Sequence, residues 1–348
     1  MKRLLFALLG IFFFVGSANA ITKHKKIEKT FTAGENLKIE SKFGKIQIKH
    51  WDKPEIKFEV LISVEGSNEE KIKKITDNIN IDFTEGEAQL SAKTVLGDFF
   101  LLKKFTNSLF NKGDIKIQYT VQLPPNVNLE IVQKDGDVFL DSHDGNLTLD
   151  LTNGNFTAQS LNGENSFTIT GCTFKAKKLN DSKLNAANSN VTIENAEKLT
   201  GESRDSEFTI GVANNISMTS ARDKFNIKEL EYLYGSSNFS KIEISQFGGE
   251  ADYDQKFGHI NIFNINNMFS FVKIDSKYGD VGLSFMEGAQ IDYEINHKSV
   301  KFDNSKDFIL VNKATADKKT FVAKGRVGDK KAFSKLNIRA NNCKIRLQ

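Results

Sequence analysis

A short unit that recurs along the chain constrains its fold more than any other feature. Each copy combines a glycine or small residue with two apolar residues that are separated by one position. Side chains two residues apart in a strand share a face, so the apolar pair points to one side. Glycine permits positive φ, and we expect it to turn the chain at a corner. The clear copies occupy residues 41–48, 133–140, 142–149, 255–262 and 276–283, with weaker ones at 151–158 and 203–210.

The spacing of these units predicts an all-β coil. The first apolar residues of later units lie at 191, 208, 225, 242, 260, 281 and 302. A period of roughly 17–21 residues, with two short strands in each repeat, suits a coil in which every turn stacks on the last. We therefore expect residues 115–348 to form a right-handed parallel β-helix, or β-solenoid. A β-sandwich is the alternative, because Asp135-Gly136, Asp144-Gly145 and Asn153-Gly154 are typical hairpin turns.

Residues 21–114 differ from the rest of the chain, although they include the first copy of the unit at 41–48. They contain a longer strand near 55–64 and a short helical pattern at 68–77, with glutamates early and lysines late, as the helix dipole favours. Terminal units of repeat proteins are atypical, so we expect a β-rich N-terminal cap that carries one short helix. Residues 95–114 form an insertion without strand alternation.

The first twenty residues have the parts of a secretory signal peptide. Lys2 and Arg3 precede an apolar run at 4–15, and the small residues at 17–20 suit cleavage before Ile21. The sequence predicts an exported protein, periplasmic or on the cell surface or extracellular, with no transmembrane span in the mature chain. The mature chain has 46 basic and 44 acidic side chains, which argues against a general nucleic-acid binder, because such a protein needs a concentrated basic surface.

Histidines and cysteines give no sign of a metal or cofactor site. The five histidines are dispersed along the chain, and His143 and His259 occupy variable positions of the unit, where we expect them on the surface. Cys343 alternates with apolar residues, which is typical of a core position. Whether it pairs with Cys172 stays open, because a disulfide requires Cα atoms within about 7 Å.

Two stretches of the chain carry a family resemblance. Residues 119–140, YTVQLPPNVNLEIVQKDGDVFL, combine a strand that ends in proline, a second strand and a Gly-Asp-Val unit. Together with 31–46 and 51–56 they resemble the putative-adhesin family of β-strand repeat proteins, exported bacterial domains of unknown function. The resemblance covers most of residues 27–302. It implies a β-solenoid in the cell envelope and supplies no catalytic residues.

A column of basic residues is the first candidate site. Most of its members precede the apolar residue of a unit by four positions, and equivalent positions of a solenoid stack about 4.8 Å apart. Such a line of cations could hold an anionic polysaccharide or lipid headgroups. The alternative is a solvated turn that neighbouring acids neutralise. The column comprises Lys42, Lys134, Arg204, Arg222, Lys256, Lys277 and Lys298.

The insertion is the second candidate site. Its apolar residues recur at three- and four-residue steps, as in an amphipathic helix that docks a partner or a membrane surface. The alternative is a flap over the protein's own core. The candidate contact residues are Phe99, Phe100, Leu102, Phe105, Leu109 and Phe110.

The sequence favours a non-enzymatic cell-envelope protein, an adhesin or a structural module that presents a repetitive surface to a glycan or a protein. A carbohydrate-active β-helix enzyme is the alternative, because the many carboxylates cannot be paired from sequence. Self-association through the solenoid ends stays open.

Overall fold

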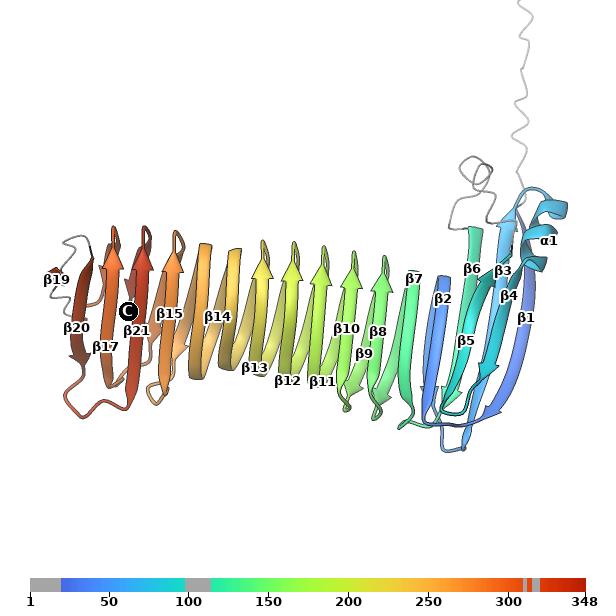
Figure 1. The fold of residues 1–348 in the computed structure, drawn as a ribbon, viewed down its shortest axis with the longest axis horizontal. Helices are drawn as coiled ribbons and strands as arrows, with labels where there is room; N and C mark the ends of the chain where they lie inside the picture. The colour runs from blue at the N-terminus through green and yellow to red at the C-terminus, as the bar shows by residue number, and fades with distance from the viewer. Residues whose placement is uncertain (1–19, 98–113, 309–311, 315–319) are drawn as a thin grey trace, which may run out of the picture.

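A computed structural model describes residues 20–97, 114–308, 312–314 and 320–348. It is all-β apart from one helix, as predicted, and its strands hydrogen-bond into one continuous sheet (Figure 1). The elements are β1 (Ile21–Thr32), β2 (Asn36–His50), β3 (Glu55–Gly66), α1 (Glu69–Asp77), β4 (Ile79–Glu85), β5 (Gln89–Leu96), β6 (Ile115–Leu123), β7 (Asn128–His143), β8 (Leu147–Thr152), β9 (Asn155–Leu161), β10 (Asn165–Thr170), β11 (Thr173–Ala187), β12 (Asn190–Arg204), β13 (Glu207–Ala221), β14 (Lys224–Ile265), β15 (Phe271–Lys277), β16 (Asp280–Phe285), β17 (Ile291–Lys298), β18 (Lys301–Asn304), β19 (Asn312–Ala314), β20 (Phe321–Val327), β21 (Ser334–Asn341) and β22 (Lys344–Leu347).

Antiparallel strands and the helix occupy the N-terminal end. β3 lies between β1 and β6, antiparallel to both, and buries every second side chain. α1 begins where the Asn68 side chain accepts a hydrogen bond from the backbone N–H of Lys71 at 2.9 Å. Ile72 and Ile75 of α1 are buried, which anchors the helix to the sheet. The division into 21–114 and 115–348 stays a prediction, because β2 pairs with β5 and β6 on one side and with β7 on the other.

Parallel pairing dominates the rest of the chain. Val138 of β7 lies beside Phe156 of β9, and one position of the unit is occupied on β11 to β14 by Phe174, Val191, Phe208 and Phe225, each beside the next. A closed ring of parallel strands runs through β7, β8, β10, β11 and β9 and back to β7. It closes because β7 and β11 each bend around a corner, so that each pairs with β9 on one face and with β8 or β10 on the other. A sandwich of hairpins would need antiparallel pairs here, so the alternative prediction is wrong.

Equivalent apolar residues stack in the interior. Phe156 and Phe174 lie one turn of chain apart with their ring centroids at 4.8 Å, and Phe208 and Phe225 stack at 4.3 Å. All four side chains are buried. The period of the sequence therefore creates columns of rings, each covered by the next.

At the corner of the unit, the residue with left-handed φ is mostly not the glycine that the sequence predicts. The residue that adopts left-handed φ is mostly the one before the glycine, such as Asp135 at 53° and Asn153 at 56°. The next residue is glycine because a Cβ at Gly154 would meet the carbonyl oxygen of Gly136 in the preceding turn. At Gly154 close stacking of the backbone, rather than positive φ, is what requires glycine, whereas Gly258, at the same position of its unit, also has a φ of 82°.

The C-terminal segment is inserted into the stack out of sequence order. β21 lies between β15 and β17, parallel to both, and β22 lies between β16 and β18. The units at 281 and 302 are therefore not neighbours, although the spacing of the sequence places them in succession. β20 then covers β17 in antiparallel orientation (Figure 1). Self-association through the ends stays a prediction.

Candidate functional site

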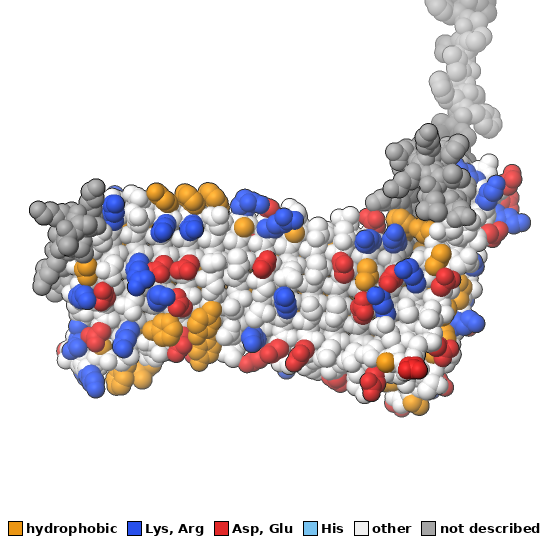
Figure 2. Space-filling view, viewed as in Figure 1, with side chains coloured by type: hydrophobic (Ala, Val, Ile, Leu, Met, Phe, Trp, Pro, Cys, Tyr) orange, Lys and Arg blue, Asp and Glu red, His pale blue; other side chains and the backbone are white. Residues whose placement is uncertain are grey.

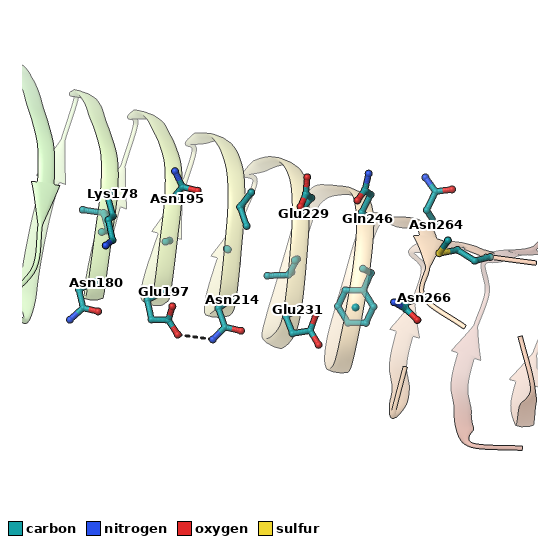
Figure 3. Close-up of a pocket in the computed structure, with 18 residues that line it drawn as sticks. Lys178, Asn180, Asn195, Glu197, Asn214, Glu229, Glu231, Gln246, Asn264 and Asn266 are labelled. Carbon is teal, nitrogen blue, oxygen red and sulfur yellow. Dashed lines mark hydrogen bonds between the residues drawn. The ribbon is translucent and has the colours of Figure 1, made fainter. Parts of the chain in front are cut away.

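An open groove of about 700 Å³ runs along one corner of the stacked turns, across β11 to β14 (Figure 3). We call it the polar groove. Two rows of side chains line it, each with one member per turn. The first row is Lys178, Asn195, Val212, Glu229, Gln246 and Asn264, and the second is Asn180, Glu197, Asn214, Glu231, Gly248 and Asn266.

The groove is concave because the residue between the two rows points into the core. These middle residues are all buried: Leu179, Ala196, Ala213, Leu230, Phe247 and Ile265. Strand alternation sends the residues on either side outward, so they stand as two ridges. Five steps of about 4.8 Å separate the six turns, which gives a groove about 24 Å long.

Amides and carboxylates dominate both ridges. The Asn214 amide donates a hydrogen bond of 2.7 Å to the Glu197 carboxylate of the neighbouring turn. The carboxylate of Glu229 lies 3.1 Å from the Lys228 ammonium. The carboxylate of Glu231 lies where a side chain at Gly248 would be, so this glycine leaves room for an acceptor in the groove. With three glutamates and one lysine, the lining carries net negative charge.

Apolar side chains are exposed near one end of the groove. Met286 lines the groove and is 50% exposed. Phe263, which precedes Asn264, and Met268, two residues after Asn266, are 45% and 67% exposed. The backbone N–H of Met286 donates to the carbonyl of Ile265, which fixes this end to the stack. The groove thus ends beside a hydrophobic rim.

The structure brings together only parts of the predicted basic column. Lys42 is the direct neighbour of Lys134, and Lys256 of Lys277. Between these pairs the same position holds Thr152, Thr170, Ala187, Arg204, Ala221 and Asn238. Lys298 is separated from Lys277 by Asn341 of the inserted strand. The seven residues therefore do not form one continuous line, and anion binding by any of them stays a proposal.

Arg222 lies at the next corner position rather than in the lysine column. Its guanidinium donates two hydrogen bonds, of 2.6 and 2.7 Å, to the carboxylate of Asp205. This ion pair holds the pKa of Asp205 below its usual range and raises that of Arg222. Arg222 therefore fits the alternative prediction, a turn whose cation is neutralised by a neighbouring acid, better than a free cation. The six candidate residues of the insertion, 99–110, lie outside the described residues.

A buried histidine pair joins the first two turns of the stack. His143 is fully buried, so its predicted surface location is wrong, whereas His259 is half-buried. The Nδ1 atom of His143 lies 3.1 Å from the Nε2 atom of His50, within hydrogen-bond distance. Burial lowers the pKa of His143 to about 4, helped by the neighbouring His50, and burial also lowers the pKa of His50.

The two cysteines are free thiols. They occupy equivalent positions of the unit but lie about seven turns apart, roughly 34 Å, which excludes a disulfide between them. Cys172 is buried and its thiol donates to the carbonyl of Leu151 at 3.2 Å. Cys343 packs against the core as predicted.

Within the described ranges no cluster of three or more His, Cys, Asp or Glu side chains is arranged to hold a metal ion. The same ranges contain no helix that is long and apolar enough to cross a membrane.

The polar groove was not predicted from the sequence, although the sequence carries a signal for it. Asn180, Glu197, Asn214 and Glu231 recur at a constant spacing, one turn of chain apart, and the residue before each is apolar. The period of the sequence places apolar residues in the core, and outward-facing polar residues with the same period form rows in the same way.

Comparison with known proteins finds similar solved structures of low sequence identity. No family model matches the chain, and no curated protein matches it. Among solved structures it is similar to a "putative cell adhesion protein" from Clostridium sporogenes ATCC 15579 at 11% identity, which covers 93% of this chain and 99% of that one, with a TM-score of 0.22. A "putative adhesin" from Bacteroides fragilis NCTC 9343 has 11% identity, coverage of 93% and 97%, and a TM-score of 0.28.

A third similar structure is a "putative lipid binding protein" from Parabacteroides distasonis ATCC 8503. It has 10% identity, coverage of 78% of this chain and 95% of that one, and a TM-score of 0.33. Two of the three descriptions match the adhesin name of the family that the sequence resembles. Because the identities and TM-scores are low, these likenesses say nothing about the function of this chain.

Proposed function

We propose that the protein is a non-enzymatic binding protein of the cell envelope and that its polar groove holds a linear, uncharged glycan. The observation that carries this proposal is the pair of amide and carboxylate rows along the groove. A groove about 24 Å long and open to solvent suits an extended chain better than a compact ligand. The rows supply one or two polar groups at each turn, and a polymer with regularly spaced hydroxyls could use them all.

The chemistry of the rows favours hydroxyl groups. Amides donate and accept hydrogen bonds, carboxylates accept them, and a sugar hydroxyl does both. The three glutamates repel an anionic polymer, which discriminates in favour of a neutral glycan. The exposed Phe263, Met268 and Met286 could contact the apolar face of a sugar at the end of the chain.

The same groove gives less support to the alternative of a glycoside hydrolase. Such enzymes need two carboxyl groups that flank the bond, one of them kept protonated by an apolar pocket. Glu229 and Glu231 lie on opposite ridges, but Glu229 is paired with Lys228 and the groove is open to solvent. Holding a chain is therefore better supported than cutting it.

Export and the handedness of the coil belong to the same proposal. We infer a right-handed β-solenoid because connections between parallel strands of one sheet are right-handed in about 98% of cases. Residues 1–20 have the pattern of a cleavable signal peptide but lie almost wholly outside the described residues. Export would place the groove where envelope glycans are found.

The test is binding of a chain that begins at Ile21 to a panel of neutral linear glycans and anionic polymers, measured by titration calorimetry. Such a chain keeps every element that the structure describes. The proposal predicts binding to at least one neutral glycan. Asn180→Ala and Asn214→Ala should each weaken it about fivefold, the effect of losing one neutral hydrogen bond.

Thr192→Ala and Thr209→Ala are the matched controls. Both threonines are exposed on β12 and β13 outside the groove lining, so affinity should not change. Equal losses in both pairs of variants, or binding to anionic polymers alone, would refute the groove as a site for a neutral glycan. Release of shorter sugars during the titration would favour the hydrolase instead.

A further inference from the structure

Three exposed aromatic rings stand in a line at one corner of the molecule. Phe239 stacks on Phe257 with the ring centroids 4.5 Å apart, and Phe257 on Tyr278 at 5.3 Å. The three side chains are 56%, 37% and 55% exposed. Figure 2 shows a line of hydrophobic side chains on the upper edge, over β14 and β15, with lysine or arginine side chains directly below. We call Phe239, Phe257 and Tyr278 the aromatic ridge.

The backbone of the ridge is in an unfavourable conformation for such residues. All three have φ between 57° and 59°, in the left-handed region that bulky side chains rarely adopt. In most other turns this corner position holds residues that tolerate the region, including Asp135, Asn153, Gly171, Asn188 and Asn342. Phe43, at φ 61°, is also aromatic, but it is partly buried and packs against the core, unlike the ridge. Aromatic residues here add backbone strain and leave apolar surface in water, so the fold alone does not account for them.

Lysines accompany the ridge. Lys256 and Lys277 immediately precede Phe257 and Tyr278, and both ammonium groups are exposed. Among the described residues neither has a carboxylate within 4 Å. The acidic side chain of Asp275, two residues before Lys277, is 3.8 Å from Arg339, so it is turned toward a different cation.

We propose that the aromatic ridge and its lysines form a contact with an anionic lipid surface. The three rings lie along an exposed edge, which suits a broad, deformable surface. Lys256 and Lys277 also line a hollow of about 520 Å³ beside them, together with Asp254 and Asp275. Stacking covers the ring faces that a sugar would need, but it leaves the edges free to enter the boundary between headgroups and acyl chains. Exposed lysines beside such rings are attracted to anionic headgroups. This contact is separate from the polar groove.

The test is co-sedimentation of the chain from Ile21 with two kinds of vesicle, one of phosphatidylcholine alone and one with a phosphatidylglycerol for every two phosphatidylcholines. We expect binding to the anionic vesicles, weakened by salt. The triple variant Phe239→Asn, Phe257→Asn, Tyr278→Asn should abolish it. Asparagine occupies the same corner at 153, 188 and 342 with φ of 50° to 56°, so this variant should fold, which circular dichroism and thermal unfolding check.

The lysines are tested by the double variant Lys256→Gln, Lys277→Gln. Each lysine near an anionic surface contributes about fivefold in affinity, so the expected loss is about 25-fold. The matched control is Lys175→Gln, Lys183→Gln, two exposed lysines of β11 outside the ridge, the basic column and the groove lining, and it should change little. Equal binding to both kinds of vesicle, or full binding by the triple variant, would overturn the proposal. So would binding to soluble polyanions with none to vesicles.

Discussion

The buried histidine pair makes the stability of the fold depend on pH in a calculable way. His143 is fully buried, and its Nε2 atom has no hydrogen-bond partner among the described residues. Its folded-state pKa of about 4 lies below the ordinary value of 6.5. The folded protein therefore binds fewer protons than the unfolded chain between these values, and stability falls as the pH falls.

The size of the effect follows from the two pKa values. At pH 8 neither state protonates His143 appreciably. At pH 5 the unfolded histidine is almost fully protonated and the folded one is not, which corresponds to a loss of about 2 kcal/mol of unfolding free energy. His50 acts in the same direction, because burial lowers its pKa too, although the carboxylates of Asp141 and Asp144 oppose this shift.

Urea unfolding at pH 8 and pH 5 measures this loss directly. His143→Leu removes the titrating group, so the difference in unfolding free energy between the two pH values should shrink by about 2 kcal/mol. His259→Gln, at a half-buried position on β14, is the control and should leave most of the difference in place. If His143→Leu keeps the full pH dependence, the histidine pair is not its source and the reasoning fails.

The remaining predictions concern the corner, a buried carboxylate, the inserted strands and export. Gly154→Ala sets a Cβ against the carbonyl of Gly136 and should lower the free energy of unfolding in urea by about 1–3 kcal/mol. Gly34→Ala, with nothing within 4 Å of the added Cβ, should lower it little, and equal losses would contradict the role of close stacking. Asp223→Ala leaves three donors around this buried carboxylate unpaired and should lower the free energy of unfolding by about 3 kcal/mol in the same assay. An unchanged stability would contradict a stabilising role of these hydrogen bonds. A chain that ends at Phe333 lacks β21 and β22, so amide exchange at 271–304 should accelerate while 128–221 stays protected; unchanged exchange would contradict the insertion. Protein recovered from the cell envelope should begin at Ile21 on N-terminal sequencing, and an intact Met1 would contradict cleavage.

The period of the sequence was sufficient to predict an all-β chain whose strands stack in regular turns. An apolar residue such as Phe208 finds Phe225 one turn later because both occupy the same position of the unit. The insertion of β21 and β22 could not be predicted in this way. Ile345 pairs with Val281, which lies much earlier in the sequence, and only the closing of the coil around its own C-terminal segment sets that register.

The candidate sites were less predictable because they depend on which turns become neighbours. The lysine column is broken by Thr152, Thr170 and Ala187, which occupy the same position in the turns between the lysines. His143 occupies a variable position of the unit, yet it is buried because it meets His50 at the junction with the first turn. The outward direction of the polar rows follows from strand alternation once the buried residues between them are known.

The most direct test of the polar groove is the dependence of affinity on glycan length. Calorimetric titration with a series of neutral linear oligosaccharides of one type would measure it. If the rows bind one chain along the groove, affinity should rise with each added sugar until the oligomer spans about 24 Å and then level off. Asn214→Ala, near the middle of the groove, should weaken the long oligomers more than the short ones. An affinity that does not change with oligosaccharide length would contradict the account. So would a polymer that binds although none of its oligosaccharides does.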